Sequence, residues 1–219
     1  MTADPPGWHP VPPRRSLLAR PAVTGLLGFV AGALLVGVPW LVLGLLGGPS
    51  GRPLTAPASL GGLGRAQDAI AKVGKDRGQP LIDRVGKSDR ETAARVSAAY
   101  GGAGAVVQQY QDDELRRTIQ LLAVRAPSPG LIAPYEDAEA LGLAAPGTEL
   151  VTFGDVQCLV QHDPVSAGSA PDPERSSVRT CQRTGTDLTV TLKSLSSEGN
   201  RDPREIAAIV EEAWAILTR

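Results

Sequence analysis

The sequence PAVTGLLGFVAGALLVGVPWLVLGLLGG, residues 21–48, sets the organisation of the whole chain. It lies in a longer stretch between Arg20 and Arg52 that contains no charged residue. A helix needs about 20 apolar residues to cross the hydrocarbon core of a bilayer, so this stretch is long enough. A soluble domain rarely contains a helix that is apolar on every side. We therefore expect one transmembrane helix at 21–48, in contact with the lipid bilayer.

The expected span divides the 219 residues into further parts. Residues 1–20 contain five prolines and no apolar periodicity, which is typical of a disordered tail. Residues 49–79 begin as a tether rich in Pro, Gly and Ser and continue as a weak amphipathic helix. Residues 80–219 are expected to form one folded domain, because a chain of that length can bury a core of its own.

Positive charge lies on the N-terminal side of the span. Arg14, Arg15 and Arg20 precede it, whereas only Arg52 follows it closely. Short flanking segments that are rich in Lys and Arg stay in the cytoplasm. The N-terminus is therefore expected in the cytoplasm and the C-terminal domain outside, as a single-pass protein of the cell membrane. The two cysteines agree with this orientation, because disulfides persist in oxidising compartments.

Two features of this region leave alternatives open. Ala56-Pro57-Ala58 matches a signal-peptidase pattern, but the apolar region of a signal peptide is only about 7–15 residues, shorter than this run. Within the span, Gly28 and Gly32 form a GxxxG pattern, which would allow two helices to approach closely in a homodimer. Glycine is, however, generally common in membrane helices.

The charge distribution excludes a nucleic-acid partner. Three of the 22 basic residues and one of the 23 acidic residues precede the span, so the remainder is acidic, with a net charge of about −3. Nucleic-acid binding requires a clustered basic face.

Start and stop signals predict two helices in the outer domain. Ser88-Asp89-Arg90-Glu91 matches a capping box for a helix of about 89–100, which Gly101-Gly102 ends. Asp202-Pro203 begins the C-terminal helix, followed by a single apolar stripe. Pro134 is expected to open a short helix to Leu141.

Alternating and apolar segments predict strands between these helices. They lie at 105–111, 117–126, 149–153, 156–161, 178–183 and 188–195, where 149–153 and 156–161 form two strands or one bent strand. The segment 117–126 is largely apolar on both faces, which is typical of a central strand. Because strict βαβ alternation is absent, we expect an α+β fold, an antiparallel sheet with helices on one face.

Cys158 and Cys181 lie in neighbouring predicted strands and are expected to form a structural disulfide. By the chain-entropy estimate, a bridge across this separation stabilises the fold by roughly 3 kcal/mol. The alternative is an extracytoplasmic thiol enzyme, because Val178-Arg179-Thr180-Cys181 resembles the active-site strand of a sortase. Such an enzyme needs a histidine base within reach of the thiol, and His162 is the only histidine after the span.

Other chemistry is not indicated. His162-Asp163 lacks the further ligands of a metal site. The acidic groups at 112–114 and 136–139 occupy a turn and a helix start, where carboxylates have structural roles. The sequence contains no Gly-rich phosphate loop, no G-x-S-x-G and no H-E-x-x-H. We therefore predict no catalytic residue, metal or cofactor, and a binding or interaction module of the cell envelope with a protein or cell-wall partner.

The segment AAYGGAGAVVQQYQDDELRRTIQLLAVRAPSPGL, residues 98–131, and the later GDVQC resemble an uncharacterised group of actinobacterial membrane proteins and lipoproteins. The resemblance covers roughly residues 80–219. It implies a secreted α+β domain with a cysteine pair in its sheet, and no established activity. The chain departs from the group in the long polar segment 162–176.

Overall fold

The computed structural model describes residues 53–74, 78–170, 175–196 and 199–219. These residues belong to a compact unit that begins at Pro49. The expected tail, the span at 21–48 and the Gly28/Gly32 pattern lie outside the described residues. Within the described part of the chain, no helix is long and apolar enough to cross a membrane.

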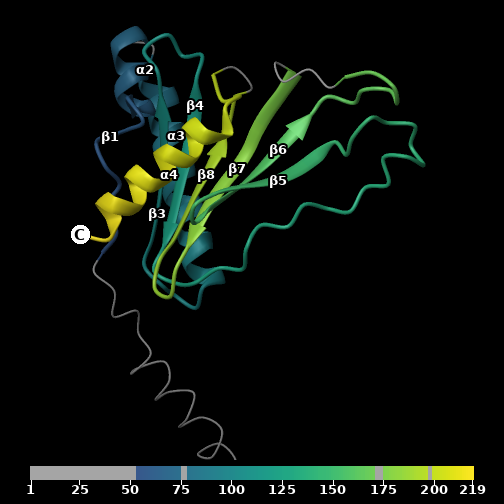
Figure 1. The fold of residues 1–219 in the computed structure, drawn as a ribbon. Coiled ribbons are helices and arrows are strands. Elements are labelled where there is room, and N and C mark those ends of the chain that lie inside the picture. The colour runs from purple at the N-terminus through teal and green to yellow at the C-terminus, as the bar shows by residue number, and fades with distance from the viewer. Residues whose placement is uncertain (1–52, 75–77, 171–174, 197–198) are drawn as a thin grey trace, which may run out of the picture. The chain divides into compact units, whose positions relative to one another are not determined.

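One antiparallel sheet organises the domain, with the strand order β1-β2-β3-β4-β8-β7-β6-β5 (Figure 1). The described strands are β1 Ser59–Leu60, β2 Leu63–Arg65, β3 Ala105–Gln111, β4 Thr118–Val124, β5 Thr148–Phe153, β6 Val156–His162, β7 Ser176–Thr184 and β8 Thr189–Ser194. The described helices are α2 Ala66–Gly74, α3 Gln79–Ala99 and α4 Pro203–Leu217. The predicted α+β class and antiparallel sheet are confirmed, and β5 and β6 form a hairpin rather than one bent strand.

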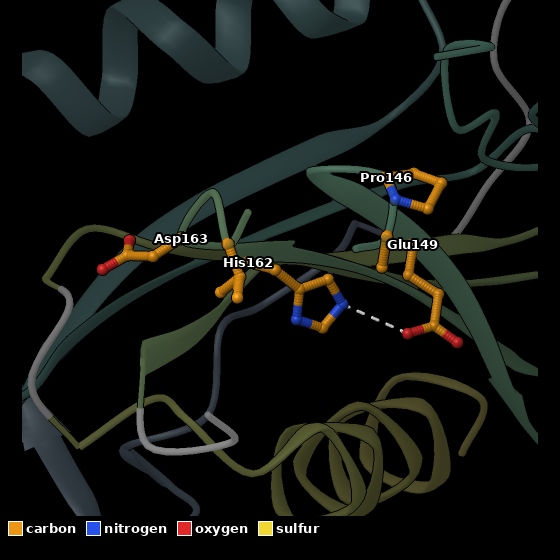
Figure 2. Close-up of a pocket in the computed structure, with 6 residues that line it drawn as sticks. Pro146, Glu149, His162 and Asp163 are labelled. Atoms are coloured by element: carbon orange, nitrogen blue, oxygen red, sulfur yellow. Dashed lines mark hydrogen bonds and ion pairs between the residues drawn. The ribbon is translucent and has the colours of Figure 1, made fainter. Parts of the chain in front are cut away.

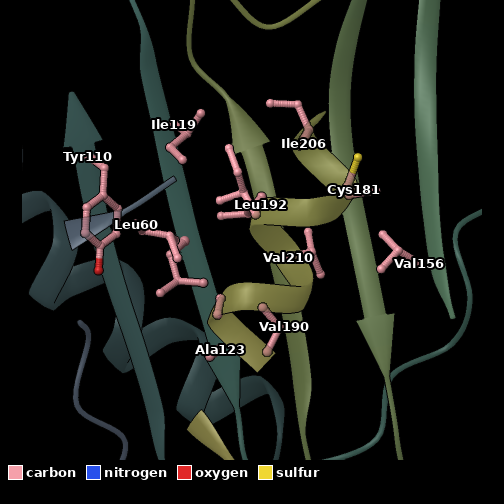
Figure 3. Packing of buried hydrophobic residues seen from close by; sticks show 14 of the residues in the cluster. Leu60, Tyr110, Ile119, Ala123, Val156, Cys181, Val190, Leu192, Ile206 and Val210 are labelled. Carbon is pink, nitrogen blue, oxygen red and sulfur yellow. The ribbon is translucent and has the colours of Figure 1, made fainter. Parts of the chain in front are cut away.

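The hydrophobic core lies between the sheet and α4 (Figure 3). Ile119, Leu121 and Ala123 alternate along β4 and are buried on the α4 side. Val210 of α4 is fully buried in the same core. The helix begins as predicted, because the side chain of Asp202 accepts a hydrogen bond from the backbone N–H of Arg204 at 2.9 Å.

The helices do not all lie on one face, so that expectation is wrong. Leu122 and Val124 of β4 alternate with the core residues and therefore point away from α4. Val96 of α3 and Tyr100, the residue that follows the helix, border the same hollow as these two side chains. Because β4 is apolar on both faces, its second face also has to be covered, and α3 provides that cover.

α3 is longer than expected and starts at Gln79, so Ser88–Glu91 lies inside the helix and is not a capping box. Asp89 instead connects the helix to β3. Its carboxylate is 4% exposed and accepts hydrogen bonds from the backbone N–H of Gln109 at 3.1 Å and from Gln109 Nε2 at 3.0 Å. The predicted end of the helix is confirmed, because Gly102 has φ +89° and donates from its N–H to the carbonyl of Ser97 at 2.8 Å.

The folded unit includes residues that were expected to be tether. Leu60 and Leu63, from β1 and β2, lie in the core under α4. Gly61 between them has φ +58° and its Cα lies against Ile209, where an added Cβ would clash at 2.5 Å. The hydroxyl of Tyr110 donates to the carbonyl of Pro57 at 2.8 Å. The chain from about residue 56 onward therefore belongs to the domain.

The helix expected at 134–141 is absent, and residues 138–142 form turns. Carboxylates bind backbone N–H groups here instead of starting a helix. Asp137 Oδ1 accepts from the N–H of Ala140 at 3.0 Å, and Glu136 Oε2 accepts from the N–H of Gly147 at 2.6 Å. These hydrogen bonds close the segment into a surface loop.

Candidate functional site

A groove of about 470 Å³ lies on the face of the sheet that α4 leaves free. Its floor is formed by β4, β8 and β7, the strands at the centre of the sheet. Residues that pair across antiparallel strands point to the same face. The register therefore builds three rows across the floor: Gln120–Lys193–Thr180, Leu122–Thr191–Gln182 and Val124–Thr189–Thr184.

The end of α3 and the segment after β4 form the walls of the groove. Val96 and Tyr100 line one side, and Ser128 and Leu131 line the other. The hydroxyls of Tyr100 and Ser128 are hydrogen-bonded to each other, which connects the two walls at one end.

The wall formed by the segment after β4 is held against the sheet by hydrogen bonds with side chains of the strands. Gln182 Nε2 donates to the carbonyl of Pro129 at 2.7 Å. The backbone N–H of Ser128 donates to Thr184 Oγ1 at 3.0 Å, and the N–H of Leu131 donates to Gln157 Oε1 at 3.0 Å. The groove is therefore pre-formed rather than dependent on a loose loop.

The polar groups of the floor already have partners within the protein. Thr180 Oγ1 donates to the carbonyl of Leu192 at 3.0 Å, and Thr189 Oγ1 donates to the carbonyl of Ala126 at 2.8 Å. Thr191 Oγ1 donates to Gln182 Oε1 at 3.3 Å. With these groups satisfied, the floor offers a ligand mainly methyl and methylene surface.

A β-bulge places a cation at one end of the groove. Leu159 pairs with Thr180 and Val160 pairs with Val178, so Arg179 is an extra residue in β7. Its side chain lines the groove beside Thr180. Bulges commonly redirect a side chain in this way next to a functional site.

Lys193 lies opposite Thr180 and places a second cation at the same end. Arg179 and Lys193 are both exposed, and neither side chain forms an ion pair or hydrogen bond with any residue that the structure describes. They are also the only charged residues among the described residues that line the groove. The row that contains Val124 lies four residues along β4 from the row that contains Lys193, so the two rows are about 13 Å apart.

A second polar cluster connects the ends of β5, β6 and β7 (Figure 2). His162 Nε2 lies 3.1 Å from Glu149 Oε2, and His162 Nδ1 lies 2.8 Å from Ser176 Oγ. Hollows of about 150 and 270 Å³ border the His162–Glu149 pair. Asp163 points away from the imidazole and accepts from Arg175 Nε at 3.1 Å.

This cluster is a cross-strand connection in its present geometry. His162 and Ser176 are directly opposite each other in the β6–β7 ladder, which explains their contact without any role in catalysis. Across the described residues, no group of three or more His, Cys, Asp or Glu side chains could hold a metal ion.

The cysteines lie on the other face of the sheet, in the core under α4. Cys158 and Cys181 are paired in the β6–β7 ladder, with their Cα atoms 4.0 Å apart and their sulfur atoms 2.01 Å apart in a disulfide. Both are fully buried. His162 is four residues from Cys158 along β6, about 13 Å away, so it does not reach a cysteine sulfur.

Arg183 in β7 and the acidic turn at 112–114 both have structural partners. Arg183 pairs with Glu211 and, at 2.9 Å, with Asp155, and its guanidinium lies 4.4 Å from the ring centroid of Trp214. Asp112 Oδ1 accepts from two backbone N–H groups of the β3–β4 turn, at 2.7 and 3.0 Å. The structural role expected for the acidic turn is confirmed.

The groove was not predicted from the sequence, although one signal was present. The apolar second face of β4 indicated that something covers or occupies it. No family model, no curated protein and no solved structure matches this chain. The function therefore has to be inferred from the chemistry of the groove itself.

Proposed function

We propose that this protein is a membrane-anchored binding module of the cell envelope, and that the groove over β4, β8 and β7 holds its ligand. The main observation that supports this proposal is the groove itself. Its volume of about 470 Å³ lies within the roughly 300–1,000 Å³ of small-molecule sites. It also combines an apolar floor, a wall fixed by hydrogen bonds and a few free polar groups, as such sites do.

The location outside the cytoplasm is supported by the N-terminal sequence and the disulfide. The uncharged stretch at 21–48 is long enough to anchor the chain in the bilayer, and Arg14, Arg15 and Arg20 favour a cytoplasmic N-terminus. A disulfide between Cys158 and Cys181 suits an oxidising compartment. The resemblance of residues 80–219 to actinobacterial envelope proteins fits the same assignment.

The thiol-enzyme alternative has less support. It requires Cys181 as a thiolate, and this residue is buried and bonded to Cys158. It also requires a base, and His162 is occupied by Glu149 and Ser176. A ligand site on the opposite face needs neither cysteine to be free.

Filling the groove tests the proposal without assuming the nature of the ligand. Thr191 lies in the middle row of the floor, so Thr191→Trp places an indole where the ligand is proposed to lie. The full-length protein is isolated from the membranes of its own cells, and native mass spectrometry measures the bound mass. Thr152→Trp is the matched control, because Thr152 is exposed on the edge strand β5 outside the groove.

We expect bound mass in the wild type and in Thr152→Trp, and its loss in Thr191→Trp while circular dichroism shows that this variant is still folded. Equal bound mass in both variants, or none in the wild type, would contradict the assignment of the groove as the ligand site.

A further inference from the structure

We infer that the ligand in the groove is a single-chain amphiphile with an anionic head, either a carboxylate or a phosphate. This inference rests on the proposed function, because it assigns a ligand class to the same site. It follows from three features of the groove: the position of its cations, the nature of its floor and the separation between its ends.

The anionic head is assigned from the two cations. Arg179 and Lys193 lie at one end of the groove and have no partner among the described residues. Two positive charges at the same end of one groove attract an anion, which lowers the repulsion between them. A guanidinium and an ammonium together provide several N–H donors, which carboxylate and phosphate oxygens accept in charge-assisted hydrogen bonds.

The apolar chain is assigned from the rest of the lining. Leu122, Val124 and Leu131 lie beyond the cationic row, with Val96 and Tyr100 on the wall. Thr189 and Thr191, which lie between them, use their hydroxyls in hydrogen bonds within the protein. A hydrocarbon chain buries this surface without leaving its own polar groups unpaired, whereas a polar glycan or peptide backbone would lose hydrogen bonds to water.

The cationic end and the apolar part of the groove follow one another along the strands. This arrangement favours a ligand with one extended hydrocarbon chain. The row that contains Lys193 and the row that contains Val124 are separated by four residues, about 13 Å. A head bound at Arg179 and Lys193 therefore directs its chain along β4 and β8 towards Tyr100 and Ser128, where the walls meet.

Photocrosslinking with defined probes tests this assignment. The probes are palmitic acid, hexadecyl phosphate and hexadecanol, each with a diazirine in the chain. They are added to the full-length protein in nanodiscs of neutral phosphatidylcholine. Mass spectrometry then measures the labelling of the tryptic peptide Thr118–Arg125, which carries Leu122 and Val124. The two anionic probes distinguish a carboxylate head from a phosphate head.

The variants remove the cations without disturbing the fold. Arg179→Gln/Lys193→Gln replaces two exposed side chains, and Arg116→Gln replaces an exposed arginine in the β3–β4 turn as the matched control. We expect the double variant to lower labelling by an anionic probe about tenfold and to leave labelling by hexadecanol unchanged, since tenfold corresponds to about 1.4 kcal/mol. Arg179→Lys/Lys193→Arg should retain most of the labelling.

The inference would be overturned by equal labelling of the wild type by hexadecanol and the anionic probes, or by labelling of the double variant at the wild-type level. A groove that no probe labels would also overturn the ligand class. The proposed function would survive that last result if Thr191→Trp still loses bound mass, because that comparison assumes no ligand chemistry.

Discussion

Two buried polar side chains fasten the outer parts of the domain to β3. Asp89 holds α3 through Gln109, and Tyr110 holds the segment before β1 through the carbonyl of Pro57. Each bond joins residues that are far apart in the chain. Losing one partner leaves the other buried and unsatisfied, which costs about 1–3 kcal/mol.

Asp89→Ala should destabilise the domain by about 1–3 kcal/mol, because Gln109 loses the acceptor for both its backbone N–H and its side chain. Urea denaturation monitored by circular dichroism measures this difference. Glu91→Ala on the exposed side of the same helix is the control and should change stability by less than about 0.5 kcal/mol. Equal midpoints for the two variants would contradict the role of Asp89.

Tyr110 makes the free energy of unfolding depend on pH in the alkaline range. Burial raises the pKa of its hydroxyl above the ordinary value of 10.0. Above about pH 10 the unfolded chain therefore binds fewer protons than the folded chain, and the free energy of unfolding falls as pH rises.

Tyr110→Phe removes this dependence together with the bond to Pro57. We expect the wild type to be more stable than the variant by about 1 kcal/mol at pH 8, and the gap to narrow as pH rises above 10. Chemical denaturation at a series of pH values measures the gap. A gap that stays constant up to pH 11.5 would show that the hydroxyl ionises equally in both states.

At the scale of elements, the bulge in β7 gives the groove a charged residue that a regular strand would not place there. Without Arg179, Thr180 and Val178 would pair consecutively with Leu159 and Val160 and would still alternate between the two faces. Deletion of Arg179 should therefore leave a regular ladder, a folded domain and an intact disulfide, while removing one cation from the groove.

The matched deletion is Thr191 in the central strand β8, which has no bulge against β7. Its loss would turn part of β8 to the wrong face and should prevent folding. Thermal unfolding compares the two chains. If deletion of Arg179 lowers the melting temperature as much as deletion of Thr191, the fold requires the bulge. The bulge would then not serve only to place a cation in the groove.

The elements that the sequence predicted are those with a strong local signal. β4 has apolar side chains on both of its faces. α4 has Asp202 as its N-cap, Pro203 in its first turn and a single apolar stripe. In both elements the local sequence preference agrees with the tertiary structure. The strands that carry Cys158 and Cys181 were also placed as neighbours, as the structure has them.

The elements that were missed depend on partners distant in the chain. β1 and β2 are too short for any periodicity, and they form because Leu60 and Leu63 are buried under α4. α3 begins earlier than the sequence predicts, because Pro80 lies in its first turn, where a proline is tolerated.

The candidate site was the least predictable part. The apolar Leu122 and Val124 indicated a second covered face, but the position of the cations depends on the bulge. A bulge is defined by two strands together: Arg179 is extra only relative to the ladder of Leu159 and Val160. A single strand's sequence does not contain that information.

At the scale of the whole molecule, the sheet of the described domain separates the face that carries the disulfide and α4 from the face that carries the proposed ligand groove. The disulfide, α4 and most of the core lie on one side, and the groove lies on the other. Changes to the first face should therefore alter stability, whereas changes to the second should alter binding.

The disulfide tests this separation. Cys158 and Cys181 are 23 residues apart, so replacing both with alanine should lower the free energy of unfolding by about 3 kcal/mol. The native protein should show no free thiol until it is reduced. Differential scanning calorimetry measures stability, and the groove should still retain bound mass at low temperature. Loss of that mass in a folded double variant would show that the two faces are coupled.

Crosslinking from inside the groove in living cells tests most directly whether the groove holds a small ligand. A benzoylphenylalanine replaces Thr191 in the full-length protein, and the same residue replaces Thr152 as the control. After irradiation, the intact mass of the protein is measured. We expect a small-molecule adduct at position 191 and none at position 152. No adduct at 191, or an adduct of protein size, would contradict the claim that the groove holds a small ligand.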